Sequence, residues 1–380
     1  MHILKFMIPN RIPLSRTSIA AFGDQAGRQA STSPTDVSHR ADPPVDRLTD
    51  GKMLPLKVLI AEKIGQSGIR SIESLGSRFV SVQETDRKTP AFETELRSAD
   101  VLIVRGETKV TAELMQQSPA LSLVVRAGNG LDNIDCAFAR EHGIQINNTP
   151  GANLNSTAEH ALGLMFAASR NIASANHQIK NGNWDRHTAT GIELHGKTLG
   201  IFGPGRIGTR LGEKCKALGM TVIAHEQAGE PNLPFGPYSV FTSKNEVLER
   251  SDVVSLHIPL MEETRHFIGP AELRLMKPEA ILVNCARGGI VDEAALLDAI
   301  DAGALRGAAI DTFVDESPAE GSIGERLSRH PQVVATPHIG GQTVEALEGM
   351  GTEAAQIIGA YIEARMPTGA PSPFIGNPQP

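Results

Sequence analysis

The sequence predicts an α/β protein built from two doubly wound, parallel-sheet domains. From Lys57 onward, short apolar runs alternate with helical patterns, which is typical of parallel strands joined by helices. In the second half of the chain, one apolar run ends in three glycines spaced G-x-G-x-x-G, at Gly203, Gly205 and Gly208, and a helical pattern follows. A strand, a tight turn and a helix in this order are how a doubly wound sheet begins.

The glycine turn predicts a dinucleotide site. The first glycine permits the turn, the second lets the backbone approach a pyrophosphate, and the third lets the helix pack close to the strand. The phosphates would then lie at a helix N-terminus, where free N–H groups favour an anion. A second predicted strand, Met220–His225, ends at Glu226, and an acid about 20 residues beyond the glycines is what a ribose 2′-hydroxyl requires. The alternative is a glycine-rich turn in some other α/β fold.

The strand and helix patterns divide into two units. The predicted strands of the first unit are Lys57–Glu62, Phe79–Gln83, Val101–Arg105, Leu121–Ala127 and Ile144–Asn147. The second unit begins at Lys197, and its later strands are Asp252–Ile258, Ala280–Cys285, Gly307–Asp311 and Val333–Ala335. A long helix over Asn153–Asn171 has an apolar face wide enough to pack on a domain and on a partner subunit. The last helix, Thr343–Arg365, is expected to return to the first unit.

Composition limits the function classes. The chain has 380 residues, which favours two or three domains, and a net charge of −7, which disfavours nucleic acid or an anionic membrane as the main partner. Its three cysteines, Cys136, Cys215 and Cys285, lack the spacing of a metal site and fit a reduced compartment, so we expect buried thiols, no metal and a cytoplasmic location. No apolar run approaches the length of about 20 residues that spans a bilayer.

The two ends of the chain differ from its middle. Residues 1–52 are rich in Ser, Arg, Pro and Asp and lack sustained periodicity. We expect a disordered extension or a start codon assigned too early, although the first 20 residues carry basic residues and no acid and so faintly resemble a transit peptide. The tail, residues 367–380, carries five prolines and is expected to be irregular.

Three polar side chains follow predicted strands of the second unit. Arg287 comes directly after one strand, Glu316 lies beyond the next, and His338 follows the strand after that. Taken singly, each has an ordinary interpretation: a surface arginine, a solvated loop acid and a structural histidine. Ligands of open α/β sheets bind beyond the carboxyl ends of the strands, so together they indicate a site where the arginine can grip a carboxylate bidentately.

Several motifs carry a resemblance to a known family. They lie at Val125–Asp135, Asn148–Asn153, Trp184–Arg186, Gly191–Leu194 and Ser251–Leu260, in addition to the glycine turn and the three polar side chains. With these motifs, roughly residues 56–365 resemble the D-isomer-specific 2-hydroxyacid dehydrogenases, and most closely the D-3-phosphoglycerate dehydrogenase branch.

The resemblance implies an NAD-dependent dehydrogenase. Arg287 would bind the substrate carboxylate and carbonyl, His338 would be the acid/base, and Glu316 would be its carboxylate partner. A Rossmann NAD domain, residues 151–335, would be inserted in a flavodoxin-like substrate domain, residues 53–150 and 336–366. The long helix near Asn153–Asn171 would help to form a homodimer.

The resemblance also implies further ligand contacts. Besides the three glycines, the implied NAD contacts are Arg206, Ile207, Glu226, His257, Pro259, Thr264, Cys285, Ala286, Asp311, His338 and Gly340. Besides Arg287, the implied substrate contacts are Arg105, Thr108, Ala127, Gly128, Asn129 and Gly130. Glycine allows close backbone approach, so the N–H groups of the loop 128–130 could face the substrate carboxylate.

The chain departs from the pattern of the family that it resembles in ways that bear on the substrate. Where phosphoglycerate dehydrogenases often have Arg-Ser-x-Thr, this chain has Arg105-Gly106-Glu107-Thr108, and the acid is unfavourable for a phosphate. We expect 3-phosphoglycerate / 3-phosphohydroxypyruvate first and glyoxylate or hydroxypyruvate as the alternative. Glu226 favours NAD over NADP. No regulatory domain follows the last helix, so the short form is expected. A remote alternative is a non-enzymatic NAD-sensing scaffold, like the family's corepressor members.

Overall fold

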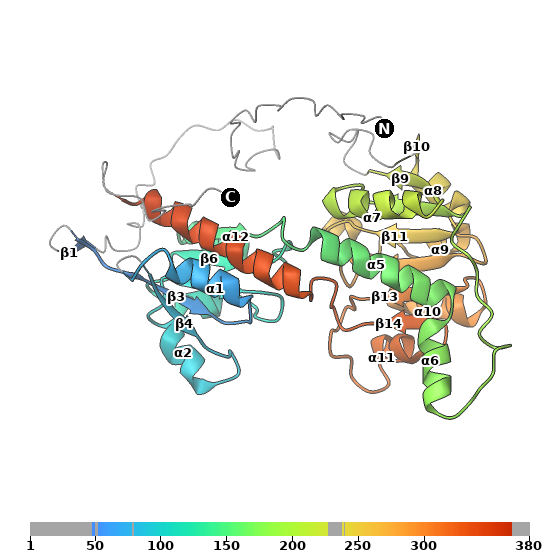
Figure 1. Ribbon diagram of the computed structural model, residues 1–380, viewed down its shortest axis with the longest axis horizontal. Helices are drawn as coiled ribbons and strands as arrows, with labels where there is room; N and C mark the ends of the chain where they lie inside the picture. The colour runs from blue at the N-terminus through green and yellow to red at the C-terminus, as the bar shows by residue number, and fades with distance from the viewer. Residues whose placement is uncertain (1–47, 50–51, 78–79, 227–237, 239, 367–380) are drawn as a thin grey trace, which may run out of the picture. The chain divides into compact units, whose positions relative to one another are not determined.

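The computed structural model describes residues 48–49, 52–77, 80–226, 238 and 240–366 (Figure 1). The predictions for residues 1–47 and 367–380 therefore lie outside the described residues. At the end of the predicted N-terminal extension, strands β1 (Leu48–Thr49) and β2 (Lys52–Met53) pair antiparallel.

The first sheet has five parallel strands in the order β4-β3-β5-β6-β7. This order corresponds to 2-1-3-4-5, which is the flavodoxin-like form of a doubly wound sheet. The strands are β3 (Leu56–Ile60), β4 (Val80–Glu84), β5 (Val101–Val104), β6 (Leu123–Arg126) and β7 (Gln145–Asn148). The helices between them are α1 (Gln66–Glu73), α2 (Pro90–Leu96), α3 (Ala112–Gln116) and α4 (Cys136–Glu141).

The second sheet has seven parallel strands in the order β10-β9-β8-β11-β12-β13-β14. Six of them follow the 3-2-1-4-5-6 order of a dinucleotide-binding sheet, and β14 adds a seventh at one edge. The strands are β8 (Thr198–Phe202), β9 (Thr221–His225), β10 (Val240–Phe241), β11 (Val253–Leu256), β12 (Ile281–Asn284), β13 (Gly307–Ile310) and β14 (Val333–Ala335). The predicted class of two doubly wound domains is confirmed.

Helices cover both faces of the seven-stranded sheet. Its central strands are buried throughout, which explains their continuous apolar runs in the sequence. The helices of this unit are α5 (Leu154–Ser169), α6 (Ile172–Lys180), α7 (Arg206–Ala217), α8 (Lys244–Arg250), α9 (Pro270–Leu275), α10 (Glu293–Asp301) and α11 (Ile323–Arg329), with a 3-10 turn at Glu262–Thr264.

The last helix, α12 (Val344–Glu363), returns to the first sheet as predicted. It lies beside α1, far away in the sequence (Figure 1). The two helices meet at glycines: a Cβ on Gly68 would lie 2.3 Å from Gly351 Cα. The Ser67 N–H donates to the Glu348 carboxylate at 2.8 Å at the same crossing. The first unit is therefore built from two separate parts of the chain, while its boundaries at residues 150 and 336 remain a prediction.

Across the described part of the chain, we find no helix whose length and apolar character would let it cross a bilayer.

Candidate active site

The glycine turn joins β8 to α7. Gly203 has φ +84°, and a Cβ there would lie 2.5 Å from the His257 carbonyl oxygen. A Cβ on Gly208 would lie 2.4 Å from the Gly203 carbonyl oxygen. Gly205, the N-cap of α7, has no described atom within 4 Å of its Cβ position. The fold thus requires the first and third glycines, while the second borders open space at a helix N-terminus, beside Arg206 and Ile207, where a pyrophosphate fits.

Glu226 lies next to this turn. It follows β9, which pairs with β8 so that Phe202 is opposite His225. The Gly203 N–H donates to the His225 carbonyl oxygen at 3.3 Å. An acid one residue beyond His225 is therefore placed at the same sheet edge as the glycines, which is the position that ribose recognition requires.

The segment after β11 contains His257, Pro259 and Thr264. Burial lowers the pKa of His257 to about 4, so its ring is neutral at pH 7, and its Nε2 lies 2.9 Å from the Ser255 hydroxyl oxygen. The Thr264 hydroxyl donates to the Pro259 carbonyl oxygen at 2.7 Å and accepts from the Met261 N–H at 2.7 Å. Thr264 is buried, so its hydroxyl shapes this loop, and its contact with a cofactor stays a prediction.

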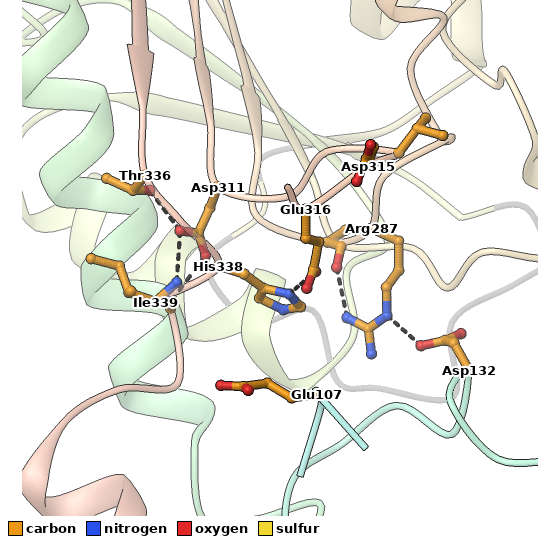
Figure 2. A network of polar contacts seen from close by, with 12 residues as sticks. Glu107, Asp132, Arg287, Asp311, Asp315, Glu316, Thr336, His338 and Ile339 are labelled. Carbon is orange, nitrogen blue, oxygen red and sulfur yellow. Dashed lines mark hydrogen bonds and ion pairs between the residues drawn. The ribbon is translucent and has the colours of Figure 1, made fainter. Parts of the chain in front are cut away.

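Arg287 is held at the end of β12 by an asparagine. The Asn284 side chain donates to the Arg287 carbonyl oxygen at 2.9 Å and accepts from the Ala286 N–H at 3.1 Å. The Arg287 guanidinium donates to the Ala286 carbonyl oxygen at 2.6 Å and pairs through Nε with the Asp132 carboxylate (Figure 2). Cys285, between Asn284 and Ala286, is buried, and burial raises the pKa of its thiol well above the ordinary value.

His338 and Glu316 are brought together as the sequence predicts. His338 Nδ1 is hydrogen-bonded to a Glu316 carboxylate oxygen (Figure 2). A carboxylate only accepts, so Nδ1 carries the proton and Nε2 is left as the ring nitrogen that a substrate can use. His338 has φ +53°, a left-handed conformation that non-glycine residues rarely adopt.

Asp311 lies at the end of β13 and is 1% exposed. Its carboxylate accepts from the Thr336 hydroxyl at 2.6 Å, from His160 Nε2 at 3.1 Å, and from two backbone N–H groups, those of Ile339 and Gly340, at 2.9 Å each. Burial raises the pKa of Asp311, but the hydrogen bonds from His160 and Thr336 outweigh it, so the net pKa is lowered. Asp311 and Gly340, two of the predicted cofactor contacts, are thus hydrogen-bonded to each other through the Gly340 N–H.

Backbone N–H groups in and next to the predicted substrate loop already donate hydrogen bonds within the protein. The Gly128 N–H donates to the Thr149 hydroxyl at 2.7 Å, and the Ala127 N–H donates to the Val104 carbonyl oxygen at 2.8 Å. These two N–H groups donate within the protein, and the contact of the loop 128–130 with a substrate stays a prediction. Gly128 allows close approach: it has φ +143°, and a Cβ would lie 1.5 Å from an Arg126 terminal nitrogen.

The rest of the loop faces Arg287. A Cβ on Gly130 would lie 1.6 Å from a terminal nitrogen of Arg287, so only glycine lets the guanidinium lie where it does. The intervening Asn129 is fixed by its carbonyl oxygen, which accepts from the Asn148 side chain at 2.5 Å. The loop 128–130 and Arg287 are therefore in direct contact.

Arg126, at the end of β6, is a site residue that the sequence analysis missed. Burial, together with the positive charges of Arg287 and Arg105, lowers its pKa to about 10. Its Nε is buried and has no hydrogen-bond partner among the described residues. An anion bound here would accept a hydrogen bond from the unused donor of Arg126. Its negative charge would also offset the repulsion among the three arginines.

Arg105 and Thr108 are held by an acid that the sequence analysis did not single out. The Glu62 carboxylate accepts from the Arg105 N–H at 3.0 Å and from the Thr108 N–H at 2.8 Å. Burial raises the pKa of Glu62, but these hydrogen bonds outweigh it, and the net pKa is lowered. Glu107, the acid expected to disfavour a phosphate, pairs with Arg87 at 2.8 Å, so part of its charge is neutralised.

No cluster of His, Cys, Asp and Glu suited to a metal ion occurs within the described ranges. All three cysteines are free thiols, and Cys215 and Cys285 are buried.

The fold and this edge of the seven-stranded sheet define a dinucleotide-dependent class of protein, and comparison with known proteins specifies it. The family description "D-isomer specific 2-hydroxyacid dehydrogenase, NAD binding domain" matches residues 162–340. The chain is 44% identical to a hydroxypyruvate reductase of Thermotoga maritima, over 67% of this chain and 82% of that protein. It belongs to the D-isomer specific 2-hydroxyacid dehydrogenase family and carries that family's NAD binding domain.

Two further relatives extend the comparison. The chain is 40% identical to the D-3-phosphoglycerate dehydrogenase of Methanocaldococcus jannaschii, over 80% of this chain and 57% of that protein, so it spans little more than half of that relative's length. The crystal structure of a D-lactate dehydrogenase from Aquifex aeolicus, complexed with NAD and lactic acid, superposes with a TM-score of 0.71 and 29% identity, and covers 81% of this chain and 96% of that one.

Proposed function

We propose that this protein is an enzyme that interconverts a D-2-hydroxy acid and its 2-keto acid with NAD(H). The observation that carries the proposal is the grouping of Arg287 with the hydrogen-bonded pair Glu316–His338, each beyond the carboxyl end of a strand of the sheet that bears the glycine turn. When bound, NADH supplies the hydride. The residues of this chain supply binding, orientation and the proton.

Arg287 and His338 divide the remaining work. Arg287 binds the substrate carboxylate and polarises the carbonyl, because a guanidinium offers paired donors in a fixed plane. His338 Nε2 gives a proton to the carbonyl oxygen in reduction and takes it back in oxidation. Glu316 accepts a hydrogen bond from Nδ1 and so holds the ring with Nε2 free for the substrate.

We propose 3-phosphohydroxypyruvate / 3-phosphoglycerate as the substrate pair. Its second anionic group needs cations beyond Arg287. Arg126 and Arg105 can supply them, because the charges of Arg287 and Arg105 both act on Arg126 strongly enough to lower its pKa. The ion pair of Glu107 with Arg87 reduces the repulsion that the Glu107 carboxylate would exert on a phosphate. The similarity to phosphoglycerate dehydrogenases supports the same choice.

A smaller acid, hydroxypyruvate or glyoxylate, is the second candidate. Gly106 stands where the phosphoglycerate branch often has a serine, so one hydroxyl donor for a phosphate is absent. The similarity to the Thermotoga hydroxypyruvate reductase supports this candidate.

NAD is proposed over NADP because of Glu226. Its carboxylate would accept from a ribose hydroxyl and repel a 2′-phosphate. Glu226→Ala should weaken NADH binding and reduce the difference in affinity between NADH and NADPH. A wild-type protein that binds NADPH more tightly than NADH would contradict the assignment of this residue.

A homodimer is proposed because the region that follows α5 leaves apolar side chains exposed. No residue of α6 is buried. Ile172 is 52% exposed, Ile179 is 50% exposed, and Trp184 is 80% exposed. A second copy that covers these side chains would remove a large apolar area from water.

A cytoplasmic location is proposed because the three cysteines are free thiols, which is typical of a reducing compartment.

A substrate panel tests the proposal most simply. Turnover of 3-phosphohydroxypyruvate, hydroxypyruvate, glyoxylate and pyruvate is measured with NADH and with NADPH. The chirality of each product is determined except for glycolate, the product from glyoxylate, which has no stereocentre. Reduction to a D-hydroxy acid with NADH, fastest for 3-phosphohydroxypyruvate, is expected. NADH binding without turnover of any keto acid would favour the non-enzymatic NAD-sensing scaffold.

A further inference from the structure

Three consecutive backbone N–H groups of the turn after β14 donate to one residue. The His338 N–H donates to the Asp311 carbonyl oxygen at 2.8 Å, and the Ile339 and Gly340 N–H groups donate to the two carboxylate oxygens of Asp311 at 2.9 Å each. The main chain of His338 is left-handed, with φ +53°, a conformation that costs a non-glycine residue of order 1–3 kcal/mol and persists only when its surroundings hold it. Asp311 is therefore what holds the His338 backbone in place.

Asp311 is in turn oriented from α5. His160 Nε2 lies 3.1 Å from Asp311 Oδ1 and 3.1 Å from the Thr336 hydroxyl oxygen. The Thr336 hydroxyl donates to the same carboxylate oxygen at 2.6 Å (Figure 2). A carboxylate can only accept here, so His160 carries a proton on Nε2 and donates it.

A second residue of α5 contacts the same turn. The Ser156 hydroxyl donates to the Gly340 carbonyl oxygen at 2.6 Å. Ser156 and His160 are four residues apart and so lie on one face of the helix. This face touches the turn directly at Gly340 and indirectly through the Asp311 carboxylate.

We propose that His160 is a positioning residue for the reaction: through its hydrogen bond to Asp311 it fixes the 338–340 turn and hence the direction in which the His338 ring meets the substrate. His160 does not touch the reacting atoms in this arrangement. The inference rests on the proposed function for its kinetic consequence, but its structural consequence can be measured without turnover. A misplacement of about 1 Å at a catalytic group can cost about 100-fold in rate, so a side chain that sets this geometry matters although it lies outside the site.

Two substitutions separate the hydrogen bond from the shape of the side chain. His160→Phe keeps a ring and removes the donor, whereas His160→Gln keeps an N–H donor at a similar reach. The matched control is His330→Phe. His330 Nε2 also pairs with a carboxylate, Asp301, at 3.2 Å, and the two histidine side chains are similarly buried, 16% and 19% exposed. His330 precedes β14, at the opposite end of the strand from His338.

The kinetic experiment measures kcat and KM for keto-acid reduction, together with the Kd for NADH. His160→Phe is expected to lower kcat by about 10- to 100-fold with little change in the Kd for NADH. His160→Gln is expected to retain most of the wild-type kcat, and His330→Phe is expected to retain it as well. Equal losses in His160→Phe and His160→Gln, or an equal loss in His330→Phe, would overturn the proposal, because the hydrogen bond at Asp311 would then not be the cause.

The second experiment measures hydrogen–deuterium exchange in the segment 336–342 of the full chain. Exchange of this segment is expected to be faster in His160→Phe than in the wild type, His160→Gln and His330→Phe. Unchanged exchange in His160→Phe would overturn the proposal. If the wild type reduces no keto acid, the proposed function fails, and this exchange measurement alone decides whether His160 holds the turn.

Discussion

Gly130 shows how closely a single position can control the site. Its missing Cβ is what lets the Arg287 guanidinium lie against the loop 128–130, since a methyl group there would be 1.6 Å from an Arg287 nitrogen. The Asp132 carboxylate, two residues further on, pairs with the same guanidinium. The direction of Arg287 is therefore set by the loop that it faces as well as by Asn284 behind it.

Gly130→Ala should displace Arg287 and weaken substrate binding. KM for the keto acid is expected to rise by about 10- to 150-fold, the equivalent of a charge-assisted hydrogen bond of about 1.5–3 kcal/mol. NADH affinity should be unchanged, because the glycine turn is untouched. The control is Gly163→Ala on α5, where a Cβ meets no described atom within 4 Å. An unchanged KM in Gly130→Ala would show that Arg287 does not bind the substrate from this position.

Asp311 gives a prediction for stability against pH. Its pKa is lowered in the folded state, so its carboxylate contributes stability that is present above the unfolded pKa of about 3.9 and is lost as the pH falls through the folded value. Asp311→Asn should lower the free energy of unfolding at pH 7 by about 1.5–3 kcal/mol. Denaturant unfolding at several pH values should show this deficit shrinking below about pH 4. A deficit of constant size from pH 7 to pH 3 would contradict the assignment.

The sequence indicated Arg287, Glu316 and His338 as a group because each follows a strand of one parallel sheet, and the family resemblance implied their roles. Arg126 and His160 were missed for different reasons. Arg126 also ends a strand, but it belongs to the other sheet, and its burial beside two arginines depends on tertiary packing. His160 lies within a helix, 151 residues before its partner Asp311, and no local pattern reports such a contact.

At the scale of elements, most strands and long helices follow from hydrophobic periodicity, whereas α8 and α11 were missed. Both are short and carry too few apolar residues for a clear pattern. Their starts were nevertheless readable, because each begins with Ser-x-x-Glu. The Ser243 hydroxyl accepts from the Glu246 N–H at 3.3 Å, and the Ser322 hydroxyl accepts from the Glu325 N–H at 3.2 Å. The capping motif predicts the start of both helices, whereas hydrophobic periodicity does not.

The crossing of α1 and α12 gives a prediction at this scale. A Cβ on Gly351 would lie 2.7 Å from Gly68 Cα, and backbone in a packed helix pair cannot easily yield. Gly351→Ala should lower the free energy of unfolding by about 1–3 kcal/mol, the usual cost of overpacking. Gly163→Ala, in a helix with open space, should be neutral or stabilising by up to about 1 kcal/mol. Equal stabilities of the two variants in urea would show that the helices separate without cost.

At the scale of the whole molecule, the exposed apolar side chains of Ile172, Ile179 and Trp184, in and just after α6, predict self-association. The double variant Ile172→Asp, Ile179→Asp should weaken the homodimer at least about tenfold, which corresponds to 1.4 kcal/mol. Ile323→Asp on α11 replaces another exposed apolar side chain and should leave the dimer intact. Sedimentation of the wild type as a monomer at micromolar concentration would refute the dimer.

The central claim is that this chain reduces a 2-keto acid with NADH and that His338 supplies the proton. The most direct test is kcat for 3-phosphohydroxypyruvate reduction in the wild type and in His338→Ala, with NADH binding measured in parallel. The account predicts that His338→Ala lowers kcat by about 10²–10⁴-fold and leaves the Kd for NADH nearly unchanged. A His338→Ala variant that turns over at the wild-type rate would contradict it.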